Sequence, residues 1–192
     1  MPKALILTLY NAGKLKMFLG CCFNFFSMNT ENKKLFQQKM LNPIFFKLFL
    51  ILKLPLAFLA GVKLKFLNDT HSTVQLKYNC LNKNPFKSIY FSALSMAGEL
   101  ASGILAASFI YKKNPAISML VVGVNIEFSK KAVGLIDFNC KQGEEIQDCI
   151  NKSIKAKEGQ SIVVTTTATD EQGDIVATFN ITWSFKAKQQ TT

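Results

Sequence analysis

The sequence is poor in histidine and in acidic residues. It has one histidine, His71, and 12 acidic residues against 23 basic ones, so its formal net charge is +11. A lone histidine with no Cys-x-x-Cys pair in the chain argues against a histidine-dependent catalytic triad and against a His-rich metal site. We therefore expect no metal, and we expect His71 to be a loop residue.

The surplus of positive charge favours acidic partners, such as phosphorylated small molecules, anionic lipid or nucleic acid. The basic residues are spread along the chain and no nucleic-acid-binding motif is present, so we expect no nucleic-acid partner. The five cysteines are odd in number, which favours reduced, mostly buried thiols in a cytoplasmic protein. They are Cys21, Cys22, Cys80, Cys140 and Cys149.

The first 27 residues are apolar without a clear period and are interrupted by Lys14 and Lys16. Two interpretations stay open for them, a disordered arm or sequence upstream of a start at Met28, and Cys21-Cys22 is a candidate for palmitoylation. We divide the chain into an N-terminal extension, residues 1–40, and one domain, residues 41–192.

Residues 42–61 (NPIFFKLFLILKLPLAFLAG) are strongly apolar but contain Lys47, Lys53 and Pro55. This run is short for a membrane-spanning helix. It either packs against the core of the domain or lies in a membrane interface with its lysines reaching toward water. Pro55 should kink or split the helix, and Gly61 should end it.

The rest of the chain alternates strand and helix signals, which predicts an α+β domain. The last four strands are expected as two consecutive pairs, the second joined by a hairpin turn at residues 170–174. We expect strands at 73–80, 117–128, 132–141, 161–168 and 175–186, and helices at 88–107 and 144–156.

The helix predicted for residues 88–107 is apolar on all sides, so it should be buried on all sides. A single curved sheet wrapped around it would achieve this, with Gly98 and Gly103 among the small residues that let strands approach. Glu99 stands in the middle of this helix and is the only acid between Asp69 and Glu127.

The spacing around Glu99 resembles that of hot-dog-fold acyl-CoA thioesterases of the phenylacetate-degradation type. In that family an Asn is followed six residues later by a His-Gly-Gly turn, and an acid lies nine residues beyond the His. Here Asn84 is followed by Tyr90-Phe91-Ser92 and then by Glu99. The segments NIEFSKKAVG and DEQGDIVATFNITW also resemble strands of this family, and the chain is most similar to a thioesterase-like branch that lacks the His-Gly-Gly turn.

The resemblance implies a hot-dog fold, a curved antiparallel sheet wrapped around a central helix, here with an extra N-terminal apolar helix. It implies hydrolysis of an acyl-CoA or acyl-carrier thioester by a homodimer or tetramer. No cofactor is implied, because coenzyme A enters as part of the substrate.

The same resemblance suggests roles for individual residues. Glu99 would be the general base at a dimer interface, Asn84 would orient the water or the carbonyl, and the backbone N–H of Tyr90 or Phe91 would bind the oxyanion. Substrate-binding candidates are Lys87, Ser88, Ser92 and Asn125, and Lys112, Lys113, Lys130 and Lys131 are further candidates for the phosphates of coenzyme A.

Each role has a structural alternative. Glu99 could cap or pair across an interface without catalysis, Asn84 could serve the Asn-Pro turn, and Tyr90 could be a core or interface aromatic. Ser88 is expected to be a helix N-cap rather than a nucleophile, because no neighbouring base could activate it. The alternative for the whole protein is a non-catalytic acyl or lipid binder in contact with a membrane surface.

Overall fold

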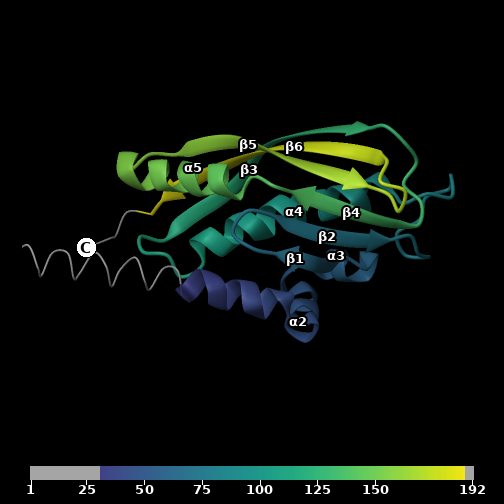
Figure 1. Cartoon of the computed structure of the whole chain (residues 1–192), viewed down its shortest axis with the longest axis horizontal. Helices are drawn as coiled ribbons and strands as arrows, with labels where there is room; N and C mark the ends of the chain where they lie inside the picture. The colour runs from purple at the N-terminus through teal and green to yellow at the C-terminus, as the bar shows by residue number, and fades with distance from the viewer. Residues whose placement is uncertain (1–30, 189–192) are drawn as a thin grey trace, which may run out of the picture.

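The computed structural model of the chain describes residues 31–188 (Figure 1). The predictions for residues 1–27, including palmitoylation of Cys21-Cys22, lie outside the described residues. Residues 31–41, at the end of the expected extension, form a helix that packs on the domain. Lys33 of this helix pairs with Asp69 at 2.7 Å, and the Phe36 ring lies 5.1 Å from that of Tyr111.

The apolar run after this helix forms two helices, α2 (Pro43–Lys53) and α3 (Pro55–Ala60). Asn42 caps α2, because its Oδ1 accepts hydrogen bonds from the amides of Ile44 and Phe45 at 3.0 and 3.3 Å. Pro55 divides the run, and Gly61 ends α3 with a φ of +88°. The predicted split at proline and stop at glycine are both confirmed.

Six antiparallel strands form one curved sheet in the order β1-β2-β4-β5-β6-β3. The α+β class and the hot-dog arrangement of a curved sheet around a central helix are therefore confirmed. The strands are β1 (Lys63–Leu67), β2 (Ser72–Lys77), β3 (Ile117–Phe128), β4 (Leu135–Cys140), β5 (Gln160–Thr169) and β6 (Ile175–Ala187).

The sheet differs from the sequence prediction in the pairing of its strands and in one additional strand. β3 and β4 were expected to pair with each other, but β3 pairs with β6, and β4 lies between β2 and β5. The short strand β1 was not predicted, because it directly follows the apolar helices and has only five residues. The hairpin of β5 and β6 is confirmed.

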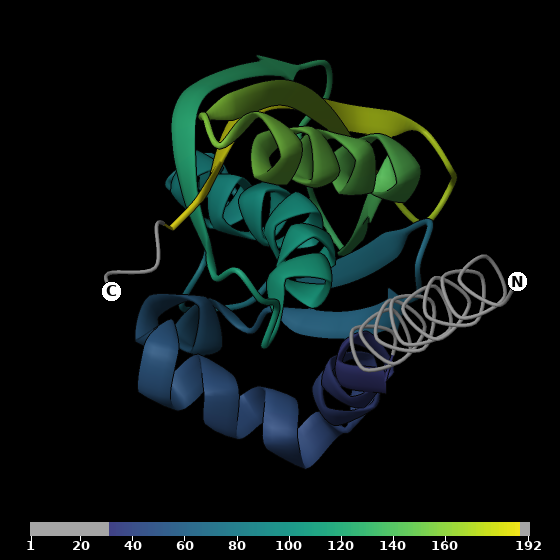
Figure 2. The same ribbon diagram turned by 90° about the vertical axis from the view of Figure 1, so that its left-hand side faces the viewer.

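The long helix α4 (Phe91–Ile110) lies in the concave face of the sheet, with α5 (Gly143–Ala156) beside it (Figure 2). Close approach of α4 and β6 depends on glycine. A Cβ on Gly98 would lie 2.8 Å from the ring of Phe179, and one on Gly103 would lie 3.3 Å from Trp183 Cζ2. By length and composition α4 could cross a membrane, but most of it is buried in the domain.

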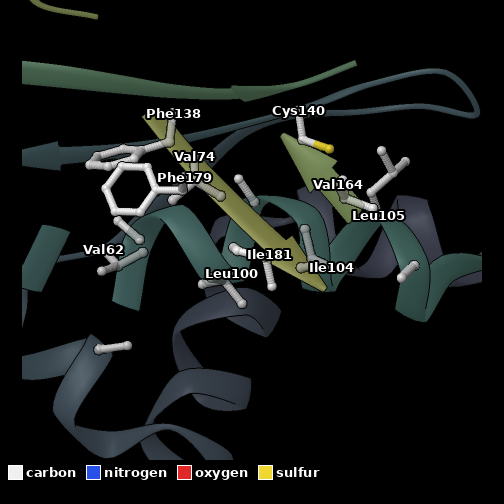
Figure 3. Close-up of a cluster of buried hydrophobic side chains, with 14 of the residues drawn as sticks. Val62, Val74, Leu100, Ile104, Leu105, Phe138, Cys140, Val164, Phe179 and Ile181 are labelled. Atoms are coloured by element: carbon white, nitrogen blue, oxygen red, sulfur yellow. The ribbon is translucent and has the colours of Figure 1, made fainter. Parts of the chain in front are cut away.

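The hydrophobic core fills the space between α4 and the sheet (Figure 3). Phe138 and Phe179 are fully buried and their ring centroids lie 5.8 Å apart. On the other side of α4, Leu100 points toward the layer formed by α2 and α3 (Figure 3). The central helix is thus covered by the sheet on one side and by the apolar N-terminal helices on the other.

Candidate functional site

The helix α4 begins three residues later than the sequence predicts. Ser88 is not its N-cap. The N-cap is Tyr90, and Ser88 belongs to the preceding loop, where its amide donates to Asn84 Oδ1. The Tyr90 N–H donates to the carbonyl of Asn82 at 2.7 Å, so this amide is not free to bind an oxyanion. The next two amides, those of Phe91 and Ser92, have no acceptor within residues 31–188. They form the positive end of the helix dipole.

The side chain of Asn84 is used by the loop before α4. Its Oδ1 accepts from the amides of Phe86 and Ser88 at 2.9 and 3.2 Å, and its Nδ2 donates to Ser88 Oγ at 3.0 Å. Ser88 Oγ is buried beside it. The turn interpretation of Asn84 therefore accounts for its contacts, and Lys87, with a φ of 59°, lies exposed in this turn.

The first turn of α4 borders an open cavity of about 370 Å³. Lys131 is exposed at this cavity, whereas Lys130 pairs with Asp170 and Asp174, both at 2.7 Å. The cavity is lined by Asn84, Ser88, Ile89, Phe91, Leu94, Phe128, Ser129, Lys130, Lys131 and Ala132. A helix N-terminus, an exposed cation and an apolar wall thus meet at one opening.

Glu99 lies in a second cavity, of about 310 Å³, between α4 and the α2–α3 junction. Its Oε1 lies near Gly103, one turn further along α4, and would lie 3.1 Å from a Cβ at that position. Burial raises the pKa of the Glu99 carboxyl, and no hydrogen bond or ion pair to another described residue offsets this effect. The other lining residues are Lys53, Leu54, Pro55, Leu56, Ala57, Met96 and Leu100.

Within one chain the two cavities are apart. Phe91 and Glu99 are separated by eight residues of α4, or about 12 Å along the helix axis. Asn125 lies on β3 opposite Asn180 and borders neither cavity. Lys112 and Lys113 follow the far end of α4, about 30 Å from its start, so one chain does not bring them to the Phe91 amide.

The aromatic pair at the start of α4 is exposed. The rings of Tyr90 and Phe91 meet edge-on with centroids 4.9 Å apart, and the Phe91 side chain is 54 % exposed. Ser92, the third residue of the replaced turn, is half-buried. Of the two side chains that stand in place of Gly-Gly, Phe91 lines the first cavity and Ser92 does not.

Asn82 was not among the predicted site residues, although it connects the end of α3 to the start of α4. Its Nδ2 donates to the carbonyl of Ala60, the last residue of α3, at 2.9 Å, and to that of Lys77 at 2.8 Å. Asn79 Nδ2 also donates to the Ala60 carbonyl, at 3.0 Å. Since Asn82 also accepts from Tyr90, one buried residue fixes the end of α3 and the start of α4.

The cysteines within residues 31–188 are Cys80, Cys140 and Cys149. Burial raises the pKa of the Cys140 thiol to about 11, and burial also raises that of Cys149. Cys80 is exposed, so two of the three described thiols follow the expectation of burial. Residues 31–188 contain no group of three or more His, Cys, Asp or Glu side chains suited to a metal ion.

Comparison with known proteins gives one family match. The model of the family described as "Domain of unknown function (DUF4442)" matches residues 44–185, most of the chain. No curated protein matches.

Several solved structures share the fold. One is a Pseudomonas aeruginosa protein described as a probable thioesterase, 18 % identical, with a TM-score of 0.63 over 76 % of this chain and 97 % of that one. A protein of unknown function from Chlorobaculum tepidum is 14 % identical, with a TM-score of 0.64 over 81 % and 94 % of the two chains. A Haemophilus influenzae thioesterase is 8 % identical, with a TM-score of 0.56 over 75 % and 92 %.

Proposed function

Because this chain belongs to the DUF4442 family and has the hot-dog fold, we propose that it hydrolyses thioesters, with acyl-CoA or acyl-carrier thioesters as its substrates. The names of two structural neighbours, a probable thioesterase and a thioesterase, support hydrolysis of this general kind. The observation that carries the proposal is Glu99, a half-buried carboxylate without a partner in an apolar cavity of the central helix. Such a group is costly to stability and is typical of catalytic sites.

In the proposed reaction Glu99 removes a proton from water as the water oxygen attacks the thioester carbonyl carbon. The carbonyl oxygen becomes an oxyanion, which the amides of Phe91 and Ser92 stabilise. Collapse of this intermediate breaks the C–S bond, and the proton held by Glu99 returns to the thiolate. The products are a carboxylic acid and a thiol, so neither a metal nor a cofactor is needed.

The proposed site requires two copies of the chain, because about 12 Å of helix separates Glu99 from the Phe91 amide. Glu99 of one copy would then face the helix start of the other. Supporting this, β3 is a 12-residue strand at the edge of the sheet, and its exposed side chains include Leu120, Val122 and Val124. An exposed apolar edge strand is a template for pairing with another chain.

Coenzyme A would bind at the opening beside the first turn of α4. Lys131 lies at that cavity, and Lys87 is exposed in the adjoining turn. Lys130 is neutralised by two aspartates, so we assign the phosphate contact to Lys131 and Lys87. Neither Asn84, whose amide is used by the loop, nor Asn125 has a part in this proposal.

The test is hydrolysis of a panel of acyl-CoA thioesters of increasing chain length by the wild type and by Glu99→Gln. We expect the substitution to lower kcat by a factor of about 10²–10⁴, the usual contribution of a general base. Glu158→Gln, an exposed carboxylate after α5, is the matched control and should leave the rate unchanged. Equal rates in the wild type and Glu99→Gln would exclude Glu99 as the base.

One observation favours a second candidate, a non-catalytic acyl binder on the same fold. The half-exposed Phe91 ring stands where the thioesterase motif has glycine, and it lines the cavity at the helix start. Such a protein would retain an acyl ligand without turnover. Acyl-CoA binding measured by calorimetry, together with no release of thiol, would favour this candidate over hydrolysis.

A further inference from the structure

The helices α2 and α3 present an apolar surface that the domain does not cover. In α2 the buried side chains Phe46 and Leu50 form a narrow stripe toward the core. Large apolar side chains occupy another side of the helix at the i, i+4, i+7, i+8 spacing of a single face. We call the exposed set in α2 and α3 the apolar face, and it comprises Ile44, Phe45, Leu48, Ile51, Leu52, Leu56, Phe58 and Leu59.

The exposure of this face is high for side chains of this size. Ile44 is 78 % exposed, Leu52 is 67 % exposed and Leu56 is 68 % exposed. Contiguous apolar surface of this kind marks a site of contact with a partner or a membrane. The two helices lie together at one side of the molecule, opposite α5, in both views (Figures 1 and 2).

The charged residues of the segment that carries the apolar face are all basic. No acidic residue occurs between Glu31 and Asp69, while this segment contains Lys33, Lys34, Lys39, Lys47, Lys53, Lys63 and Lys65. Two of these, Lys33 and Lys65, pair with Asp69 and Asp137. The other five have no carboxylate partner among the described residues. On α2 itself, Lys47 and Lys53 lie at the borders of the apolar face.

We propose that the apolar face docks onto a lipid bilayer that contains anionic headgroups. The leucine and isoleucine side chains enter the boundary between headgroups and acyl chains, and Lys47 and Lys53 remain at the level of the headgroups. A second copy of the chain is a poorer occupant, because a self-complementary contact through this face would bring its unpaired lysines together. Anionic lipid instead supplies the opposite charge.

The docked surface is continuous with the cavity that contains Glu99. Leu54, Pro55, Leu56 and Ala57, at the α2–α3 junction, form the outer wall of that cavity. An acyl chain that leaves the bilayer beneath α3 would therefore enter beside Glu99. This part of the inference rests on the proposed hydrolysis, and it makes long-chain, membrane-borne thioesters the substrate class.

Flotation of the full chain with lipid vesicles tests the docking. We expect the wild type to float with vesicles of equal parts phosphatidylcholine and phosphatidylglycerol, and to float weakly with phosphatidylcholine alone. Leu48→Gln/Leu52→Gln should lower the partition coefficient by about tenfold or more, because two buried apolar contacts are lost. Glutamine is a good helix former, so α2 should be retained.

Matched controls separate docking from general loss of apolar or basic surface. Leu81→Gln changes a 69 % exposed leucine outside the apolar face and should float as the wild type does. Lys47→Gln/Lys53→Gln should weaken binding by about fivefold per lysine on the anionic vesicles, with little change on phosphatidylcholine. Lys152→Gln/Lys155→Gln, exposed on α5 on the opposite side, should have no comparable effect.

The proposal is overturned if the wild type does not float, if it floats equally with both vesicle types, or if Leu81→Gln lowers binding as much as the α2 variant. It is also overturned if the wild type self-associates without lipid and Leu48→Gln/Leu52→Gln abolishes that association, since a second copy would then cover the face. Flotation does not require hydrolysis. A protein that floats without cleaving thioesters would refute the proposed function and leave the docking intact.

Discussion

At the scale of single residues, the position of Glu99 depends on the absence of a side chain one helical turn away. Gly103 leaves room for the carboxylate, because a Cβ at that position would lie 3.1 Å from Glu99 Oε1. The space is largely apolar, and the charge in it is not offset by a partner among the described residues. Ionisation of Glu99 therefore opposes folding, and this can be measured without any substrate.

Because burial raises the pKa of Glu99 above its ordinary value of 4.5, the folded protein holds this proton at pH values where the unfolded chain has lost it. The free energy of unfolding should thus fall as pH rises from about 4.5 through the folded pKa. Glu99→Gln removes this penalty, so its stability relative to the wild type should increase with pH over that window. Urea unfolding at several pH values measures the difference.

Glu158→Gln serves again as the control, because it replaces an exposed carboxylate that lies outside the Glu99 cavity. A constant difference between Glu99→Gln and the wild type at all pH values would contradict the stated origin of the pKa shift.

Glu99 could be singled out from the sequence because the acid is isolated within an apolar helix, and its role as the general base stays a prediction. The role of Asn84 could not be assigned, because an Asn-Pro turn and a catalytic amide have the same local sequence. Asn82 was missed for a different reason. Its hydrogen bond to Ala60 joins residues that are 22 positions apart, and nothing in its neighbours indicates that contact.

At the scale of elements, α4 packs closely against β6 at Gly98. The ring of Phe179 occupies the space that a side chain at position 98 would need. The ring is fully buried between α4, Phe128 and Phe138, so it has little room to withdraw. Glycine at this position is therefore a packing requirement.

Gly98→Ala should destabilise the protein by about 1–2 kcal/mol, since overpacking costs about 1–3 kcal/mol and the better helix propensity of alanine returns up to about 1 kcal/mol. Urea unfolding measures the change. Gly159→Ala is the control, because a Cβ there meets nothing closer than 3.9 Å and should change stability little. A Gly98→Ala protein as stable as the wild type would show that Phe179 can move.

The elements were predicted well where the pattern is local. β3 matches its predicted bounds, and β5 and β6 differ by a residue at their ends. Neighbours in the sheet were not predictable in the same way, because alternation identifies a strand but not its partner. The start of α4 shifted from Ser88 to Phe91 because contacts with Asn82 and Asn84 hold residues 88–90 in the loop.

At the scale of the whole molecule, the edge of the sheet formed by β3 has no neighbouring strand among the described residues. β3 is the last strand in the order, and its exposed residues alternate with half-buried ones along most of its length. Leu120 and Val124 are large and apolar on the exposed side. If two such edges pair across a two-fold axis, the apolar side chains of both copies are brought together.

Leu120→Lys/Val124→Lys should convert a dimer to a monomer, because like charges would meet across the pairing. Hydrolysis should fall in parallel, to about the level of Glu99→Gln, since the proposed site uses both copies. Light scattering after size-exclusion chromatography reports the mass. Val133→Lys, a half-exposed loop position, is the control and should keep the mass of the wild type.

A dimer that persists in Leu120→Lys/Val124→Lys would place the contact between copies elsewhere. A wild type that is monomeric while it hydrolyses thioesters would exclude the two-copy site.

The hydrogen bonds of Asn82 connect α3, where we propose that the acyl chain enters, to the start of α4, where we propose that the thioester carbonyl binds. The last carbonyl of α3 accepts from Asn82 Nδ2, and the Asn82 carbonyl accepts from the N–H of Tyr90, immediately before the free amides of α4. In the proposed reaction, the entry of the acyl chain beside α3 and the positioning of its carbonyl at α4 therefore depend on the same hydrogen bonds of Asn82. In the proposed reaction, an acyl chain that displaced α3 would also disturb the amides to which we assign the oxyanion.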